Sequence, residues 1–408
     1  MPGGRPLRFR FVFLAAAVPA APASAHAQAP SDCNAPTADA IEHVKVQGSP
    51  FTAVPSSDGC WIFVTVANPG GRGNVTALRR SGGVISAERS IPVNGNPTGL
   101  ALTHDGTLLI VASGPMVAFI DVARLESGRG NPVLGYIDRK QPVGFIYASV
   151  TPDDRFVFLA LERDYAIGVV DLTKIRAGKI DTKAIVGSVP TGNAPVGIAF
   201  SPDGRFAFTT AQAALPAWKW PVACKPEAQP GAAPSHAQGA VVVIDVDKAV
   251  RDPRHAVVSR VPAGCNPVRL ALSPTGDRAY VTARGENALM VFDASKLSSD
   301  TAHARLARVT VGTSPVGVTV FDSGRRVVLT NSNRFGGVGG GDRQSLTVVD
   351  AAQVAAGATS LVGEIPAGAF PRELRMTADG RTLIATNFNS GTVEFIDLAR
   401  IALAGSSR

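Results

Sequence analysis

Short runs of alternating apolar and polar residues, separated by tight-turn sequences, recur along almost the whole chain. The clearest copy is residues 273–293, SPTGDRAYVTARGENALMVFD. It begins with a Pro-Thr-Gly turn, continues as an apolar run at 279–282, breaks at 284–287 and resumes as a second run that ends on Asp293. Alternation with a period of two between turn residues predicts a β-hairpin.

Seven units of this kind follow one another, and each is opened by a proline. These prolines are Pro50, Pro97, Pro142, Pro195, Pro267, Pro315 and Pro371. Each proline precedes a short first strand, a turn that is mostly Asp-Gly, a second strand, a variable loop, a third strand and usually a fourth. In six units the third strand ends on an aspartate: Asp121, Asp171, Asp245, Asp293, Asp350 and Asp397. Four short antiparallel strands per unit, repeated seven times, predict an all-β, seven-bladed β-propeller around a central channel.

The two ends of the repeat array predict how the ring closes. The seventh unit ends after its third strand, whereas residues 40–46, ahead of the first proline, form an unattached strand. We expect this N-terminal strand to complete the last blade, because it would cover an exposed sheet edge. The propeller then spans residues 40–408, with an insertion at 211–239 in the fourth blade, after a linker at 28–39.

Residues 1–27 have the three regions of a secretory signal peptide: Arg5, Arg8 and Arg10, an apolar run at 11–18, and small residues before position 27. The apolar run is too short to span a bilayer, and no later stretch approaches that length. We therefore expect a periplasmic or secreted protein without a membrane span. Without this segment the formal charge falls from +8 to +5, since three arginines and no acid are lost.

The chain has four cysteines, an even number that suggests disulfides in an exported protein. The topology places Cys224 and Cys265 on the face where the innermost strands begin, called the mouth face here, and Cys33 and Cys60 on the opposite face. We predict a Cys33–Cys60 disulfide that fastens the closure of the ring, and a Cys224–Cys265 disulfide that anchors the insertion.

Several stretches of the chain resemble the YVTN-type β-propeller repeat family, which adjoins the seven-bladed lactonase-like propellers. They are Tyr280-Val281-Thr282-Ala283 with Asn287 and Val291-Phe292-Asp293, Pro202-Asp203-Gly204-Arg205, and Ala385-Thr386-Asn387. The resemblance covers residues 40–400 and implies the seven-bladed fold. Members of these families range from surface and periplasmic binding proteins to enzymes acting on lactones, so the resemblance implies no single function.

Two charged residues depart from the repeat at the position two residues after each proline. Five units have a small residue there, which suits the crowded approach of seven innermost strands: Thr52, Gly99, Gly144, Gly197 and Gly317. The fifth unit has Arg269, and the seventh has Glu373 flanked by Arg372 and Arg375. Charges at this position must reach water in the channel or pair with one another, because an isolated buried charge is costly.

Two interpretations of these four charged residues stay open. They form either an anion-binding patch at the channel mouth, since guanidinium groups suit carboxylate or phosphate, or an internal Arg–Glu network between non-adjacent blades. A lactonase-like enzyme would use Glu373 as a base or water-orienting group and an arginine such as Arg269 to polarise the carbonyl. No histidine aligns at these positions, which weakens the enzymatic interpretation.

Loops on the mouth face supply further candidate ligand-binding residues, Arg284 and Asn387, and the insertion supplies Trp218 and Trp220. Propellers typically bind partners on a loop-rich face of this kind, although mixed charge is also typical of a solvated surface. The insertion is either a lid or partner-binding patch, or it packs its tryptophans on the propeller. The glycine-rich stretch at 335–341 predicts a flexible loop on the same face.

The sequence contains no metalloprotease, serine-hydrolase, phosphate-loop or EF-hand motif, and its six histidines have no spacing typical of a metal pair. We expect no metal and no cofactor. The function favoured is an exported binding or scaffolding module with an unidentified protein or a small anionic ligand on the mouth face. A lactone hydrolase is the alternative. Nucleic-acid binding comes third, because basic and aromatic residues do not interleave along a strand.

Overall fold

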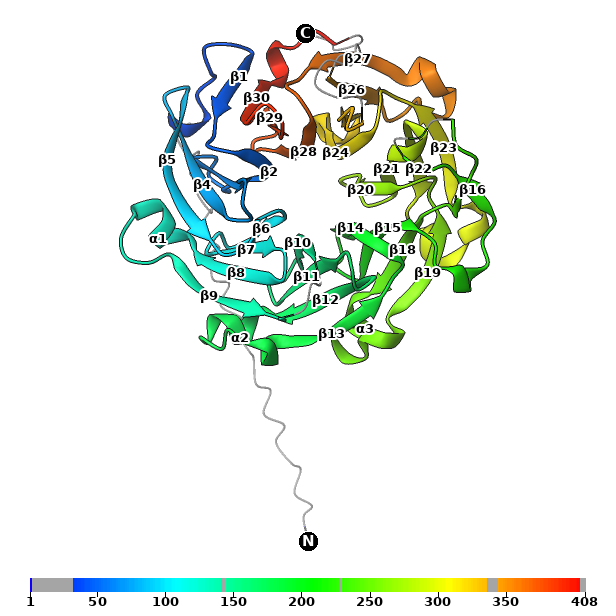
Figure 1. Ribbon diagram of the computed structural model, residues 1–408, viewed down its shortest axis with the longest axis horizontal. Helices are drawn as coiled ribbons and strands as arrows, with labels where there is room; N and C mark the ends of the chain where they lie inside the picture. The colour runs from blue at the N-terminus through cyan, green and yellow to red at the C-terminus, as the bar shows by residue number, and fades with distance from the viewer. Residues whose placement is uncertain (2–31, 141–143, 228, 230, 336–343, 404–408) are drawn as a thin grey trace.

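The computed structural model describes residue 1 and residues 32–140, 144–227, 229, 231–335 and 344–403. Residues 2–27 of the predicted signal peptide, Pro142 and residues 336–341 of the glycine-rich loop lie outside them. Within the described residues, seven four-stranded antiparallel sheets surround a central axis (Figure 1). This is the seven-bladed propeller that the repeats predict.

The four strands of each blade follow one another outward from the channel. The innermost strands are β2 (Ser49–Pro55), β6 (Leu100–Leu102), β10 (Phe145–Val150), β14 (Asn193–Phe200), β20 (Pro267–Leu272), β24 (Pro315–Phe321) and β28 (Pro371–Met376). The second strands are β3 (Trp61–Ala67), β7 (Leu108–Ser113), β11 (Phe156–Leu161), β15 (Phe206–Ala213), β21 (Arg278–Ala283), β25 (Arg326–Asn331) and β29 (Thr382–Asn387). The third strands are β4 (Gly73–Ser81), β8 (Met116–Asp121), β12 (Ala166–Asp171), β18 (Ala240–Asp245), β22 (Ala288–Asp293), β26 (Ser345–Asp350) and β30 (Thr392–Asp397). The outer strands are β5 (Val84–Val93), β9 (Val133–Asp138), β13 (Ile185–Pro190), β19 (Val257–Pro262), β23 (Arg305–Thr310), β27 (Leu361–Pro366) and β1 (Ile41–Lys45).

The N-terminal strand closes the ring as predicted. Strand β1 pairs antiparallel with β30, with Val44 opposite Val393, so the first and last strands of the array share the seventh blade. The Cys33–Cys60 disulfide joins the residues ahead of β1 to the first blade, and the Cys224–Cys265 disulfide joins the insertion to the fifth blade. Both predicted pairings are confirmed.

The aspartate that ends most third strands starts a short helical turn. The side chains of Asp121, Asp171 and Asp245 each accept a hydrogen bond from the backbone N–H of the residue two or three positions later. This bond satisfies a backbone donor that would otherwise be unpaired at the start of the helix. The α-helices are α1 (Val122–Ser127), α2 (Leu172–Arg176), α3 (Val246–Arg251) and α4 (Lys296–Ser299). No helix in the described part of the chain is long and apolar enough to cross a membrane.

Remaining elements are short. The insertion contains a two-stranded hairpin, β16 (Val222–Cys224) and β17 (His236–Ala237). The 3-10 helices are η1 (Asp32–Asn34), η2 (Thr182–Ala184), η3 (Pro216–Trp218), η4 (Pro253–His255), η5 (Arg284–Glu286), η6 (Thr301–His303), η7 (Asp322–Gly324), η8 (Val354–Ser360) and η9 (Leu398–Arg400).

Buried threonines on the second strands lock the innermost strands of neighbouring blades together. The Thr282 hydroxyl accepts the N–H of Arg269 at 3.1 Å and donates to the carbonyl of Val316, in the next blade, at 2.7 Å. The Thr386 hydroxyl donates to the Phe51 carbonyl at 3.0 Å and so joins the seventh blade to the first. These contacts hold the channel-lining residues in fixed positions.

The hydrophobic core lies between adjacent blades. Strand β11 is buried at every residue because blades cover both of its faces, which explains why its sequence is continuously apolar. One cluster, for example, combines Phe158 of the third blade with Ile198 and Val242 of the fourth. Side chains therefore fix the angle between blades, and the innermost strands are left to shape the channel.

Candidate functional site

One residue on or just before each innermost strand lies next to its counterparts in the adjacent blades. These channel residues are Thr52, Gly99, Tyr147, Gly197, Arg269, Gly317 and Glu373. A Cβ added to Gly197 would lie 3.1 Å from the Cα of Arg269, and one added to Gly317 would lie 3.2 Å from the Cα of Glu373. Glycine permits this close approach and leaves space for the larger side chains of the other blades.

The third blade differs from the sequence prediction, which gave Gly144 as its channel residue. A Cβ added to Gly99 of the second blade would lie 2.4 Å from the Cα of Tyr147. Tyr147 also has the strand register of the other channel residues. The prediction was wrong because it took the second residue after Pro142, whereas Tyr147 is the fifth residue after that proline. A tyrosine therefore faces the channel in the third blade.

Tyr147, Arg269 and Glu373 come from three non-adjacent blades and meet in the channel. Nε of Arg269 donates to Oε2 of Glu373 at 2.8 Å, and both side chains are only 3% exposed. Nη1 of Arg375 donates to Oε1 of Glu373 at 2.6 Å, and Nη2 donates to the Tyr147 hydroxyl at 2.6 Å. The guanidinium carbon of Arg269 lies 4.4 Å from the centre of the Tyr147 ring. We call these four side chains the channel network.

The channel network engages both oxygens of Glu373. Burial alone would raise the pKa of Glu373, but Arg269 and Arg375 outweigh burial, and the pKa lies below its ordinary value. Burial would lower the pKa of Arg375, but Tyr147 and Glu373 outweigh that effect and raise it. Glu373 is thus held as a carboxylate between two cations, an arrangement that suits a structural ion pair better than a general base.

Arg372 lies beside this network but outside it. Its guanidinium carbon is 3.6 Å from the centre of the Phe51 ring, 5.3 Å from that of Phe370 and 5.6 Å from that of Phe388. Among the described residues, neither the buried Nε of Arg372 nor the buried Nη1 of Arg269 has a hydrogen-bond partner. A buried donor without a partner costs free energy that a bound acceptor would recover.

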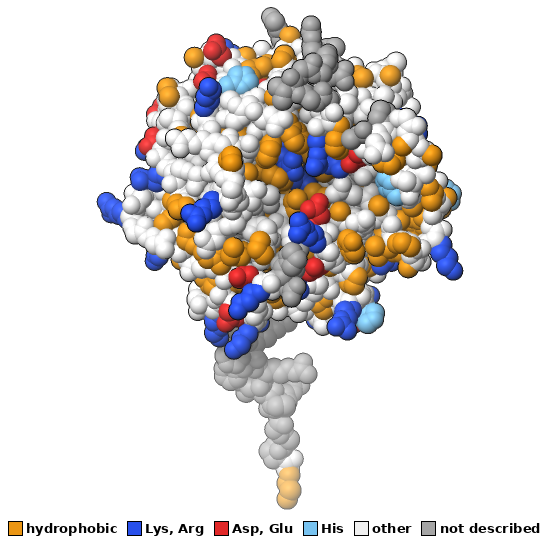
Figure 2. All heavy atoms as spheres, viewed as in Figure 1, with side chains coloured by type: hydrophobic (Ala, Val, Ile, Leu, Met, Phe, Trp, Pro, Cys, Tyr) orange, Lys and Arg blue, Asp and Glu red, His pale blue; other side chains and the backbone are white. Residues whose placement is uncertain are grey.

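The charges of two more arginines act on Arg372, and we call Arg284, Arg334 and Arg372 the mouth arginines. Burial lowers the pKa of Arg372 well below its ordinary value, and the positive charges of neighbouring arginines lower it further. Burial lowers the pKa of Arg334 as well, with Arg284 adding to the effect and Glu227 opposing it. Figure 2 shows basic side chains gathered with a few acidic ones near the centre of the ring. Positive charge is therefore in excess there.

The other predicted residues have structural contacts. Asn387 is fully buried, and its Nδ2 donates to Oε2 of Glu394 at 2.7 Å within the seventh blade. Trp218 and Trp220 lie with ring centres 5.1 Å apart and pack against the core between the third and fourth blades. The tryptophans of the insertion therefore pack on the propeller, the second of the two alternatives given above. Arg284 lies at the mouth and forms an ion pair with Glu227. Glu227 was not identified from the sequence, because it lies in the insertion and has no equivalent position in the other blades.

A compact group of potential metal ligands lies at the Cys224–Cys265 disulfide that attaches the insertion. One ligand atom each from Cys224, Cys265 and Glu286 lies within 4.8 Å of the others. The two sulfur atoms form a disulfide, so neither is a thiolate that could bind a metal. The carboxylate of Glu286 instead accepts the backbone N–H of Cys265 at 2.8 Å. This group therefore serves to anchor the insertion.

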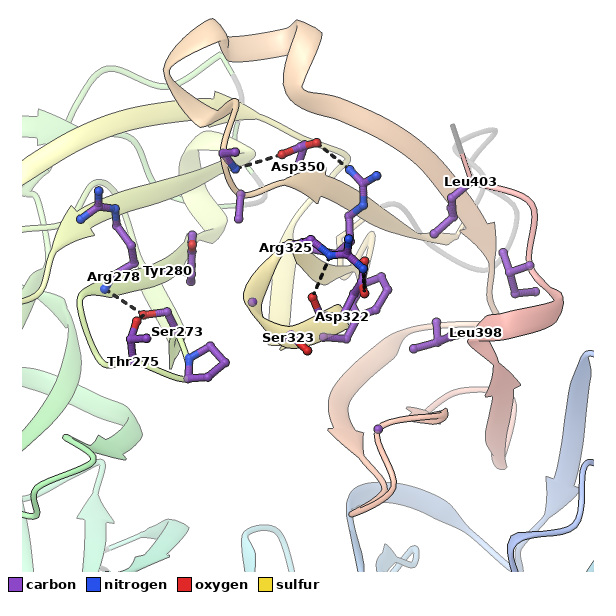
Figure 3. A pocket seen from close by; sticks show the side chains of 18 of the residues that line it. Ser273, Thr275, Arg278, Tyr280, Asp322, Ser323, Arg325, Asp350, Leu398 and Leu403 are labelled. Atoms are coloured by element: carbon purple, nitrogen blue, oxygen red, sulfur yellow. Dashed lines mark hydrogen bonds and ion pairs between the residues drawn. The ribbon is translucent and has the colours of Figure 1, made fainter. Parts of the chain in front are cut away.

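A cavity of about 1200 Å³ opens on the opposite face, among the turns of the fifth, sixth and seventh blades and residues 398–403 (Figure 3). Its arginines have partners: Arg325 binds Asp322 at 2.5 Å and Arg326 binds Asp350 at 2.8 Å. The mouth has the opposite property, with guanidinium donors that lack partners among the described residues. We therefore place the candidate site at the mouth.

Comparisons with known proteins agree with the fold. Residues 223–400 match the family model described as "Lactonase, 7-bladed beta-propeller". The chain is similar in structure to hydrazine synthase of Kuenenia stuttgartiensis, with a TM-score of 0.64 and 18% identity over 88% of this chain and 98% of that chain. It is also similar to the Cps50 (Swd1) β-propeller domain of Myceliophteria thermophila, with a TM-score of 0.61 and 14% identity over 88% of this chain and 99% of that chain. The comparison with curated proteins found no match. The structural likenesses show the propeller fold alone.

Proposed function

We propose that this protein is an exported binding module that takes a small organic anion at the mouth of its channel. The observation that supports the proposal most strongly is the setting of Arg372, whose guanidinium lies among three phenylalanine rings with a buried Nε that lacks a partner. An ionic hydrogen bond is stronger where water is excluded, and a guanidinium binds carboxylate or phosphate with matched geometry. Two disulfides support an oxidising compartment.

The surroundings of Arg372 favour a ligand with an anionic end and an apolar body. The Glu373 carboxylate beside it is held by Arg269 and Arg375, so it competes little with a ligand for Arg372. Phe51, Phe370 and Phe388 supply apolar surface beside the guanidinium. Carboxylates with a short alkyl or aromatic group combine these two properties.

Calorimetric titration of small carboxylates and inorganic phosphate tests this proposal. The Arg372→Gln variant should bind the best ligand about 10- to 150-fold more weakly than the wild type, which corresponds to losing one hydrogen bond to a charged group. The matched control is Arg325→Gln, because Arg325 is 72% exposed on the opposite face. Equal affinity in all three proteins would contradict the proposal.

Lactone hydrolysis is the second candidate function, and the match of residues 223–400 to the lactonase family model favours it. In this case Glu373 would orient water and Arg269 would polarise the lactone carbonyl. A panel of lactones, tested with the wild type, Glu373→Gln and Arg269→Ala, separates the two functions. Turnover by the wild type that both variants lose would replace the binding module with an enzyme.

A further inference from the structure

Glu227 contacts Arg284 as the carboxylate of a ligand would. Nε of Arg284 donates to Oε1 of Glu227 at 2.6 Å, and Nη2 donates to Oε2 at 2.6 Å. Nη2 also donates to Oε1 of Gln212 at 2.9 Å. The Arg284 side chain is 7% exposed and that of Glu227 is 16% exposed. Two parallel N–H···O bonds in a shielded place are the geometry by which arginine recognises a carboxylate.

The insertion of the fourth blade, and not the propeller repeat, supplies this carboxylate. Glu227 follows Cys224 by three residues, and the Cys224–Cys265 disulfide attaches the segment at the start of β20. The β16–β17 hairpin pairs Cys224 with His236, whose Nε2 lies 3.3 Å from Oδ1 of Asn266. The insertion is therefore held beside the mouth of the fifth blade, with Glu227 directed at Arg284.

Glu227 changes the charge that an incoming ligand meets. The positive charge of Arg284 lowers the pKa of both Arg372 and Arg334, so the three cations act on one another. Glu227 opposes this effect by raising the pKa of Arg334. The insertion thus cancels one positive charge beside the proposed anion site.

We propose that Glu227 determines the charge specificity of the mouth: its carboxylate fills a second anion subsite at Arg284, so the native protein favours monoanionic over dianionic carboxylates. This inference rests on the proposed function for the comparison of ligands, but the subsite itself does not depend on Arg372. Removing one partner of a buried ion pair leaves an uncompensated charge. Without Glu227, Arg284 should therefore bind an external carboxylate.

Formate rescue tests the subsite directly. The midpoint of thermal unfolding of Glu227→Ala is measured with increasing sodium formate, and with sodium chloride at equal ionic strength as the reference. Formate should raise the midpoint of Glu227→Ala more than that of the wild type or of Asp247→Ala, which removes an exposed carboxylate (83% exposed) that pairs with Arg251. Glu227→Ser, which also empties the subsite, serves if the alanine variant does not fold. Equal formate shifts in all proteins would overturn the proposal.

The charge specificity is measured with succinate and propionate, which differ by one carboxylate. In Glu227→Ala, the ratio of the two affinities should shift toward succinate by about tenfold or more, the gain expected from one ionic hydrogen-bonded pair. The ratio should stay unchanged in Asp247→Ala. If formate rescues Glu227→Ala but no ligand binding depends on Arg372, the proposed function is wrong and the Arg284 subsite remains. If ligand binding depends on Arg372 but formate gives no rescue and the affinity ratio does not change, only the proposed role of Glu227 is wrong.

Discussion

Replacing Glu373 with glutamine removes the only carboxylate of the channel network and keeps the size of the side chain. In the wild type, Glu373 accepts a hydrogen bond from Arg269 at 2.8 Å and another from Arg375 at 2.6 Å. The amide nitrogen of glutamine would face one of these guanidinium groups with donor against donor. Both cations would then remain in the channel without the carboxylate that now pairs with them.

The expected cost follows from the burial of the pair. The Arg269 and Glu373 side chains are each 3% exposed, so solvent screens their interaction little. Breaking a buried ion pair from one side costs about 3–5 kcal/mol. Loss of two hydrogen bonds to charged groups, at about 1.5–3 kcal/mol each, gives a similar figure. We therefore expect Glu373→Gln to lower the free energy of unfolding by about 3–5 kcal/mol.

Urea unfolding followed by circular dichroism measures this loss. The control is Asp247→Asn, which breaks an ion pair whose side chains are 75% and 83% exposed and should cost less than about 1 kcal/mol. The double variant Arg269→Gln/Glu373→Gln should be more stable than the sum of the two single losses predicts, because it removes one of the stranded charges. A loss below about 1 kcal/mol for Glu373→Gln would refute the role of the network as a structural ion pair.

Two further predictions concern stability. Replacing either pair of cysteines, Cys33 with Cys60 or Cys224 with Cys265, by serines should lower the free energy of unfolding in urea titrations by about 3–4 kcal/mol. This figure follows from the loop-closure entropy of disulfides that join residues 27 and 41 positions apart. Losses below about 1 kcal/mol would contradict this prediction. Burial raises the pKa of Glu394 in the folded protein above its unfolded value of 4.5. The protonated side chain therefore contributes its full stabilisation below pH 4.5, and this stabilisation is lost as the pH rises through the folded pKa. In Glu394→Gln, the free energy of unfolding should fall less as the pH rises above 4.5. Identical pH profiles for the variant and the wild type would contradict a raised pKa of Glu394.

The repeated features of the fold could be predicted from the sequence because each blade restates them. The proline before an innermost strand, the Asp-Gly turn and the aspartate after the third strand recur at similar spacing, and comparison of copies averages out local variation. The closing strand followed from counting, since the seventh unit lacks a fourth strand. The two disulfide pairings followed from the faces that this topology assigns to Cys33, Cys60, Cys224 and Cys265.

The candidate site could be predicted only in part. Arg269 and Glu373 were visible as exceptions to a small-residue position, and the structure joins them. Tyr147 was missed because the third blade has extra residues after its proline, which shifted the count. Glu227 was missed because it belongs to an insertion without counterpart in the other blades, where no comparison of equivalent positions is possible.

Calorimetric titration of propionate into the wild type, Arg372→Gln and Arg325→Gln tests whether Arg372 binds an anion at the channel mouth. We expect similar affinity for the wild type and Arg325→Gln, and an affinity about 10- to 150-fold weaker for Arg372→Gln. Undiminished binding by Arg372→Gln, or no binding of propionate or any other small anion by the wild type, would contradict this role of Arg372.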